Sequence, residues 1–110
     1  MFTLTTNKRG GEVKITYKNK KIEKECTNVK VSDKTYGKQM TEKIHMRIDQ
    51  ITSADTIEMM IQYHIGRCHS LANNRKGQYA MDLVHPYRLV FEKHGDEIQI
   101  AHILEIVDYH

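Results

Sequence analysis

The chain has 110 residues, 39% of them hydrophobic, and its 17 Lys and Arg against 14 Asp and Glu give a net charge of +3. This length accommodates one ordinary hydrophobic core, and the modest charge excludes a protein that binds nucleic acid by bulk electrostatics alone. No apolar run approaches the roughly 18 residues of a membrane span, and the first residues lack the apolar stretch of a secretory signal.

The first 27 residues predict an N-terminal arm, a strand and a short helix. We expect residues 1–12 to form the arm and residues 13–110 a single domain. Val13, Ile15 and Tyr17 alternate with polar residues, which predicts a strand. The segment KKIEKECT (20–27) predicts a short helix, with Cys26 on its core side.

A longer helix is expected to follow. Ser32 or Asp33 can cap its N-terminus, since both side chains accept hydrogen bonds from helix N–H groups. Apolar residues recur along one of its faces: Tyr36, Met40, Ile44, Ile48 and Ile51. Thr52–Ser53 predicts a break and a new cap, followed by a shorter helix over residues 54–62.

Beyond Gly66 the apolar period becomes that of strands. Alternation predicts strands over 79–83, 88–92 and 98–106, with a turn at His85–Pro86 and a hairpin at 94–96. Short connections make these three strands antiparallel neighbours, and the first strand adds at an edge or beside one of them. We therefore predict an α+β fold, with an N-terminal strand and with helices packed on one face of a small twisted antiparallel β-sheet.

Cations and proton-handling groups gather in the C-terminal half, which holds six of the seven histidines. These side chains come from four separate segments: the segment before the loop (His69), the loop itself (Arg75 and Lys76), the next strand (Arg88) and the C-terminal end (Asp108, Tyr109 and His110). If they converge, they suit metal-free cleavage of an RNA phosphodiester, which needs a base, an acid and cations that stabilise the phosphorane. An arginine fork can hold two phosphate oxygens at once.

Each of these groups also has an ordinary structural interpretation. Arg88 can form a surface ion pair, the Arg75 loop can be a solvated turn, His69 can bond to backbone, and Asp108 can pair with a cation. His64, Cys68 and His69 lack metal-ligand spacing, so we expect no metal and no other cofactor. Two cysteines form no disulfide framework, which favours a cytoplasmic protein.

Two stretches together resemble a known family. RCHSLANNRKGQYAMDLVHPYRLVFE (67–92) and ILEIVDYH (103–110) are similar to the HigB-type host-inhibition toxins of the RelE/ParE superfamily. The resemblance covers about residues 13–110. It implies a compact toxin that cuts messenger RNA in the ribosomal A site, and a helix-turn-helix antitoxin of the HigA type that neutralises it in a higher-order complex.

The resemblance implies six site residues: His69, Arg75, Arg88, Asp108, Tyr109 and His110. Some relatives have a lysine where this chain has Ala72, and here Lys76 supplies that positive charge from nearby. Either histidine can be the acid or the base. The alternative is a toxin of the gyrase-poisoning branch, which binds a protein target and cleaves nothing. A third interpretation is an interaction domain without toxicity.

Overall fold

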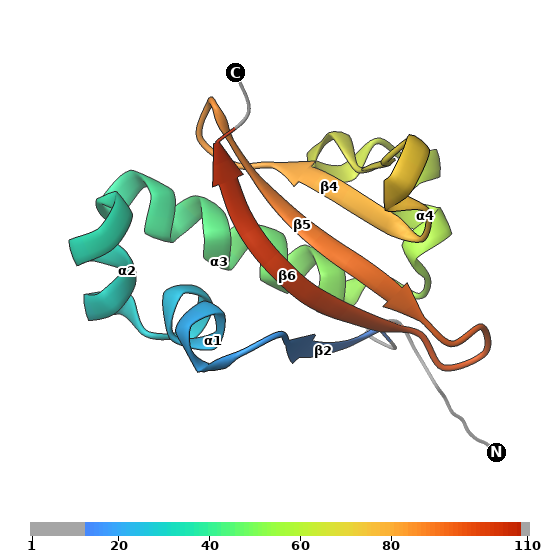
Figure 1. The fold of residues 1–110 in the computed structure, drawn as a ribbon, viewed down its shortest axis with the longest axis horizontal. Coiled ribbons are helices and arrows are strands. Elements are labelled where there is room, and N and C mark those ends of the chain that lie inside the picture. The colour runs from blue at the N-terminus through green and yellow to red at the C-terminus, as the bar shows by residue number, and fades with distance from the viewer. Residues whose placement is uncertain (1–12, 109–110) are drawn as a thin grey trace, which may run out of the picture.

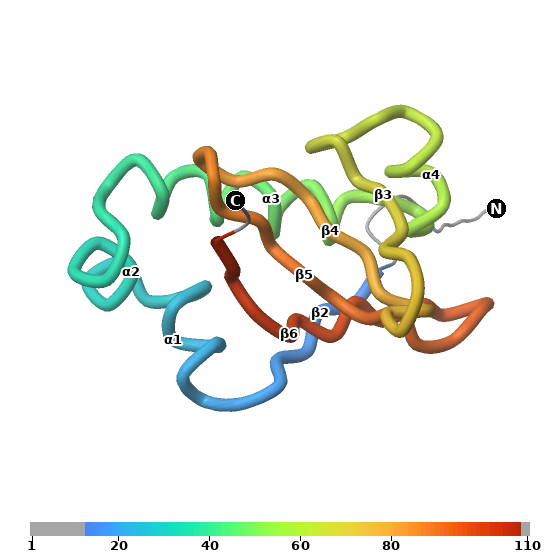
Figure 2. Tube along the Cα trace, turned by 45° about the horizontal axis from the view of Figure 1, so that its top comes forward, coloured from blue at the N-terminus to red at the C-terminus, as the bar shows by residue number. Residues whose placement is uncertain are grey.

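Five strands form one sheet in a computed structural model that describes residues 13–108 (Figure 1). Their order is β2-β6-β5-β4-β3, where β2 is parallel to β6 and every other pairing is antiparallel. The strands are β2 (Lys14–Tyr17), β3 (His69–Ser70), β4 (Gln78–Asp82), β5 (Tyr87–His94) and β6 (Ile100–Asp108). The predicted α+β fold is therefore confirmed, with the first strand at an edge. The two-residue strand β3, at the other edge (Figure 2), was not predicted.

Helices cover one face of this sheet. They are α1 (Lys20–Thr27), α2 (Val29–Tyr36), α3 (Lys38–Ser53) and α4 (Ile57–Gln62), and Figure 1 shows α3 crossing behind the strands. The core lies between the two layers, where Ile44 and Ile51 of α3 meet Leu89 and Phe91 of β5, all of them without exposed surface. No helix among residues 13–108 is long and apolar enough to cross a membrane.

The prediction of one long helix from Ser32 or Asp33 is wrong. Gly37 has a φ of 94°, a conformation that side chains with a Cβ rarely adopt, and it separates α2 from α3. The cap of α2 is Asn28, whose Oδ1 accepts from the N–H of Val31 at 3.1 Å. Ser32 is instead buried inside α2, where its Oγ accepts from Thr41 at 2.8 Å.

The predicted start of the next helix is also wrong. Residues 52 and 53 remain helical in α3, because the break falls at Ala54, which has an extended backbone with ψ 145°. Thr56 caps α4, and its Oγ1 accepts from the N–H of Met59 at 3.1 Å. The predicted apolar face of the long helix nevertheless packs in the core, through Met40 and the isoleucines of α3.

Cys26 lies on the core side of α1, as predicted, with 2% of its surface exposed. Burial raises the pKa of its thiol to about 12, and the same cause raises the pKa of Cys68 to about 12. Both cysteines are free. At neutral pH both side chains therefore stay protonated and behave as small apolar core residues.

We call the face opposite helices α1–α4 the open face, and a bulge in β6 decides which side chains of that strand lie on it. Val90 pairs with Glu105 and Phe91 with Ile103, so Leu104 is an extra residue between two pairs. Without the bulge, strict alternation from Ile103 would turn Glu105 toward the helices. The bulge lets Glu105 share the open face with Val90, while Ile106 returns to the core.

A polar link fastens α4 to the hairpin of β5 and β6. The amide of Gln99, which is 5% exposed, accepts from the N–H of Ile57 at 2.7 Å and donates to the Glu58 carboxylate at 2.9 Å. Glu58 also accepts from Lys93 Nζ at 2.6 Å. These hydrogen bonds, that from Lys93 foremost, lower the pKa of Glu58 to about 2.

We predict that this link makes the stability of the fold sensitive to acid. Because the folded state lowers the pKa of Glu58 from 4.5 to about 2, its stabilisation is present above pH 4.5 and disappears as the pH falls toward 2. Glu58 is 54% exposed, so the effect should not exceed about 1 kcal/mol. Urea unfolding at pH 7 and pH 3 should show wild type losing more stability than Glu58→Gln. Equal losses in the two proteins would contradict the prediction.

Candidate functional site

Four polar residues meet on the open face, and we call them the Asp82 cluster. Arg67 donates to Asp82 through Nε at 2.7 Å and through Nη2 at 3.1 Å. Arg88 stands opposite Asp82 in the β4–β5 register, and its Nε lies 3.4 Å from Oδ1. His69 pairs with Ala80, two residues before Asp82 on the same side of β4. One carboxylate thus holds two guanidinium groups beside an imidazole.

The charges in this cluster stabilise one another. The hydrogen bonds from Arg67 lower the pKa of Asp82, and the positive charges of Arg67 and Arg88 act in the same direction, as does that of His69 when its ring is protonated. Asp82 in return raises the pKa of Arg67. The carboxylate therefore remains ionised at neutral pH, which keeps the two guanidinium groups oriented and offsets their mutual repulsion.

The tautomer of His69 follows from its hydrogen bond. Its Nδ1 lies 2.8 Å from the carbonyl oxygen of Arg67, which can only accept, so Nδ1 carries a hydrogen. When the ring is neutral, Nε2 is then the basic nitrogen. The side chain is partly exposed. A neutral His69 can therefore accept a proton only through Nε2.

A second ion pair crosses the same face. Arg75 comes from the loop between β3 and β4, and its Nε donates to Gln78 at 2.8 Å while its Nη2 donates to Glu105 at 2.7 Å. Gln78 is on β4 and Glu105 on β6, so the Arg75 side chain passes over β5 between them. Ala80 and Val90 on this face are fully buried, although helices α1–α4 lie on the other side; a short 3-10 helix, Asn73–Arg75, carries Arg75 over the sheet here.

Arg47 supports the Asp82 cluster from the helix side. Its Nε donates to the backbone carbonyl of Asp82 at 2.6 Å, and its Nη1 donates to Gln50 at 3.0 Å. Gly66, next to Arg67, packs closely against it, since a Cβ there would lie 2.8 Å from Arg47 Nε. One α3 side chain therefore fixes the backbone on both sides of the Arg67–Asp82 pair.

The structure brings some of the predicted site residues together. His69 and Arg88 belong to the Asp82 cluster, and Arg75 lies on the same face. Lys76 is exposed in the adjoining loop. All four lie on the open face or on the loop that adjoins it.

The predicted site residue at the end of β6, Asp108, is not brought to the open face. Asp108 is aligned with Tyr87, whose ring packs toward the helices, so the register places Asp108 on the side away from Arg88. The predicted residues Tyr109 and His110 lie outside the described residues 13–108.

Sequence reasoning missed Arg67 and Asp82. Asp82 alternates with Met81 in the predicted strand, which is a signal that its side chain faces away from the core. Arg67 gives no such signal, because it lies in a turn with a φ of 53° and reaches Asp82 across 15 positions of sequence.

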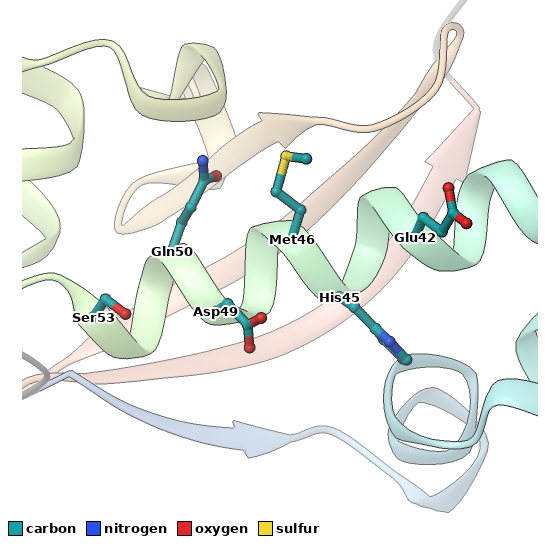
Figure 3. A pocket seen from close by; sticks show the side chains of 6 residues that line it. All are labelled: Glu42, His45, Met46, Asp49, Gln50 and Ser53. Atoms are coloured by element: carbon teal, nitrogen blue, oxygen red, sulfur yellow. The ribbon is translucent and has the colours of Figure 1, made fainter.

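Two hollows differ in what they could bind. A cavity of ≈ 80 Å³ adjoins the Asp82 cluster and is lined by Arg67, Asp82, Leu83, His85, Pro86, Tyr87 and Arg88. A wider, shallow hollow lies on α3 alone (Figure 3), lined by Glu42, His45, Met46, Asp49, Gln50 and Ser53. Its two carboxylates disfavour an anion, whereas two arginines line the cavity on the open face. No group of three or more His, Cys, Asp or Glu within residues 13–108 could hold a metal ion.

Comparisons with known proteins identify the fold. No protein-family profile matches the chain, and no curated protein matches its sequence. A YoeB/ParE toxin from Agrobacterium tumefaciens matches 88% of this chain and 99% of its own, with a TM-score of 0.62 and 13% identity. The YoeB dimer structure from Staphylococcus aureus matches 90% of this chain and 98% of its own, with a TM-score of 0.54 and 22% identity. The chain shares the fold of these toxins.

We predict that Arg67 occupies its position at a cost to stability. Its backbone is left-handed, which a residue with a Cβ adopts less readily than glycine. Arg67→Gly and Arg67→Gln both remove the exposed ion pair, but only glycine relieves the backbone. In urea, the glycine variant should unfold at a midpoint roughly 0.5 M above that of the glutamine variant. A lower midpoint for glycine would show that the turn is not strained.

Proposed function

We propose that the chain is the toxin of a type II toxin–antitoxin system, a metal-independent endonuclease that cuts messenger RNA on the ribosome and so inhibits translation. The fold that it shares with two toxin structures supports this proposal, as does the resemblance of residues 67–92 to HigB-type toxins of the RelE/ParE superfamily. The observation that carries it is the Asp82 cluster, where an imidazole with a defined tautomer stands beside two oriented guanidinium groups.

In this proposal two histidines handle the protons. The Nε2 of His69 takes the proton from the 2′-hydroxyl that attacks the phosphorus, and His110 protonates the 5′-oxygen that leaves. The opposite assignment uses the same residues. General acid–base help of this kind contributes about 10²–10⁴-fold to a rate.

The remaining site residues bind and stabilise the RNA. Arg88 and Arg75 hold the phosphorane oxygens, and each must exchange part of its carboxylate contact for phosphate when RNA arrives. Lys76 adds a charge along the backbone of the message. Tyr109 stacks on a base or orients it, and Asp108 belongs with Tyr109 and His110 to the catalytic terminus that the resemblance implies.

The proposal includes partners. As a toxin acting in the cytoplasm, the chain would be neutralised by a cognate helix-turn-helix antitoxin, of the HigA type if the HigB resemblance holds, in a complex of higher order. The resemblance on which this partner rests leaves the interface open. The lysine-rich α1 and the loop with Arg75 are both candidate surfaces.

A second candidate function has one observation in its favour. Arg67 and Arg75 are already paired with carboxylates in the free protein, as in an ion-pair network that only supports the fold. In that case the chain would act by binding a protein target such as DNA gyrase, without cleaving RNA. A supercoiling assay that the chain inhibits, with message left intact, would favour this function.

We predict that Arg88→Ala lowers the rate of message cleavage on programmed ribosomes by roughly 10²-fold, as expected on losing one preorganised donor for the phosphorane. The matched control is Lys34→Ala, which removes an exposed cation of α2 on the helical side of the molecule. It should cleave at the wild-type rate. Wild-type cleavage by a folded Arg88→Ala variant would contradict the assignment of Arg88.

A further inference from the structure

We propose that Arg67 is a further RNA-binding residue, and that the cavity between Arg67, Arg88 and the His85–Pro86 turn is a subsite for a backbone phosphate. This inference rests on the proposed function, because it takes RNA as the ligand of the open face. It adds a contact that the predicted set of site residues lacks. It also gives Asp82 the role of a positioning residue, which acts through Arg67 and does not touch the substrate.

The donors of Arg67 leave room for a ligand. A guanidinium group carries five N–H donors in a fixed plane. Arg67 gives Nε and Nη2 to the two oxygens of Asp82, so one edge of the plane is occupied and the outer edge keeps its donors. The side chain is 59% exposed, against 34% for Asp82. The fork is therefore held in one orientation with its outer edge toward solvent.

The charge of the cavity favours an anion. Two guanidinium groups and one carboxylate line it, which leaves a net positive charge before His85, which also lines it, is counted. The guanidinium groups of Arg67 and Arg88 are planar and present parallel N–H donors, which match the geometry of phosphate oxygens better than a lysine ammonium group does. A phosphodiester, which presents two such oxygens, fits this chemistry.

The backbone around Arg67 is built to present this side chain. Gly66 and Arg67 both have left-handed backbones, with φ of 58° and 53°. The N–H of Cys68 closes the turn on the carbonyl of Ile65 at 2.9 Å, and Arg47 packs against Gly66. A non-glycine residue in this region is uncommon, and here the left-handed backbone sets the direction in which the Arg67 side chain leaves the turn.

The same turn couples Arg67 to His69. The carbonyl of Arg67 accepts the hydrogen of His69 Nδ1 at 2.8 Å, so a single residue orients the imidazole through its backbone and reaches Asp82 through its side chain. A phosphate bound to Arg67 would consequently lie next to the one on which His69 acts. The subsite would therefore determine which phosphate of the message lies beside His69, the proposed general base.

Binding of a single-stranded 2′-O-methyl oligonucleotide, which lacks the attacking hydroxyl, tests this inference without cleavage. Fluorescence anisotropy over a series of salt concentrations reports the number of phosphates contacted. Arg67→Gln should weaken binding and reduce the salt slope by about 0.7, the value for one phosphate of a single strand. Arg67→Lys should keep the slope but bind more weakly, because it retains the charge and loses the fork.

Two further variants complete the experiment. Lys34→Gln removes a cation far from the open face and should leave the slope unchanged. Asp82→Asn removes a negative charge, so simple electrostatics predicts tighter binding, whereas loss of the orientation of Arg67 predicts weaker binding. We expect weaker binding. Tighter binding by Asp82→Asn would overturn the positioning role of Asp82.

The outcomes separate this inference from the function on which it rests. A wild-type slope in folded Arg67→Gln overturns the phosphate subsite and leaves cleavage untouched. If the wild type binds the oligonucleotide with the expected slope but never cuts the matching all-ribose message on programmed ribosomes, the nuclease function fails and the Arg67 contact stands. If the wild type does not bind the oligonucleotide at all, the phosphate subsite is overturned, whereas cleavage on programmed ribosomes still decides the nuclease function.

Discussion

The open face depends on the carboxylate of Asp82. It accepts three contacts from two arginines that come from different segments, and its backbone carbonyl accepts a further one from Arg47 on α3. Without this carboxylate, two guanidinium groups would approach each other with only solvent to screen their repulsion. A single negative charge therefore permits a local concentration of positive charge on a chain whose net charge is only +3.

The sheet supplies the geometry that this charge needs. Cross-strand register places Arg88 opposite Asp82 and His69 opposite Ala80, so the cluster spans β3, β4 and β5. The bulge at Leu104 turns Glu105 to the same side, where it receives Arg75 from the loop. Helices close the other face, and the apolar core keeps the strands in register. Asp82, Arg88, His69 and Glu105 are thus mounted on strands, whereas Arg67 and Arg75 reach them from turns between the elements.

Much of this was predictable from the sequence. The alternation of apolar and polar residues identified the three long strands and the edge strand. It also placed the Arg88 side chain on the opposite face of the sheet from Leu89 and Phe91. Gly37 escaped notice because the apolar stripe of α3 extends back to Tyr36 across the break. The bulge and the left-handed turn at Arg67 have no signature in hydrophobic period. Since they decide where Glu105 and Arg67 point, the ion pairs could be known only from the fold.

Mapping the ends of cellular messages after brief induction tests most directly whether the open face cuts message. The wild type should generate new 5′ ends in phase with the reading frame, because the ribosome presents the substrate codon by codon. Induction of His110→Gln at an equal level of folded protein should generate none. Growth arrest by the wild type with messages left intact would contradict the claim and favour a toxin that acts by binding a protein.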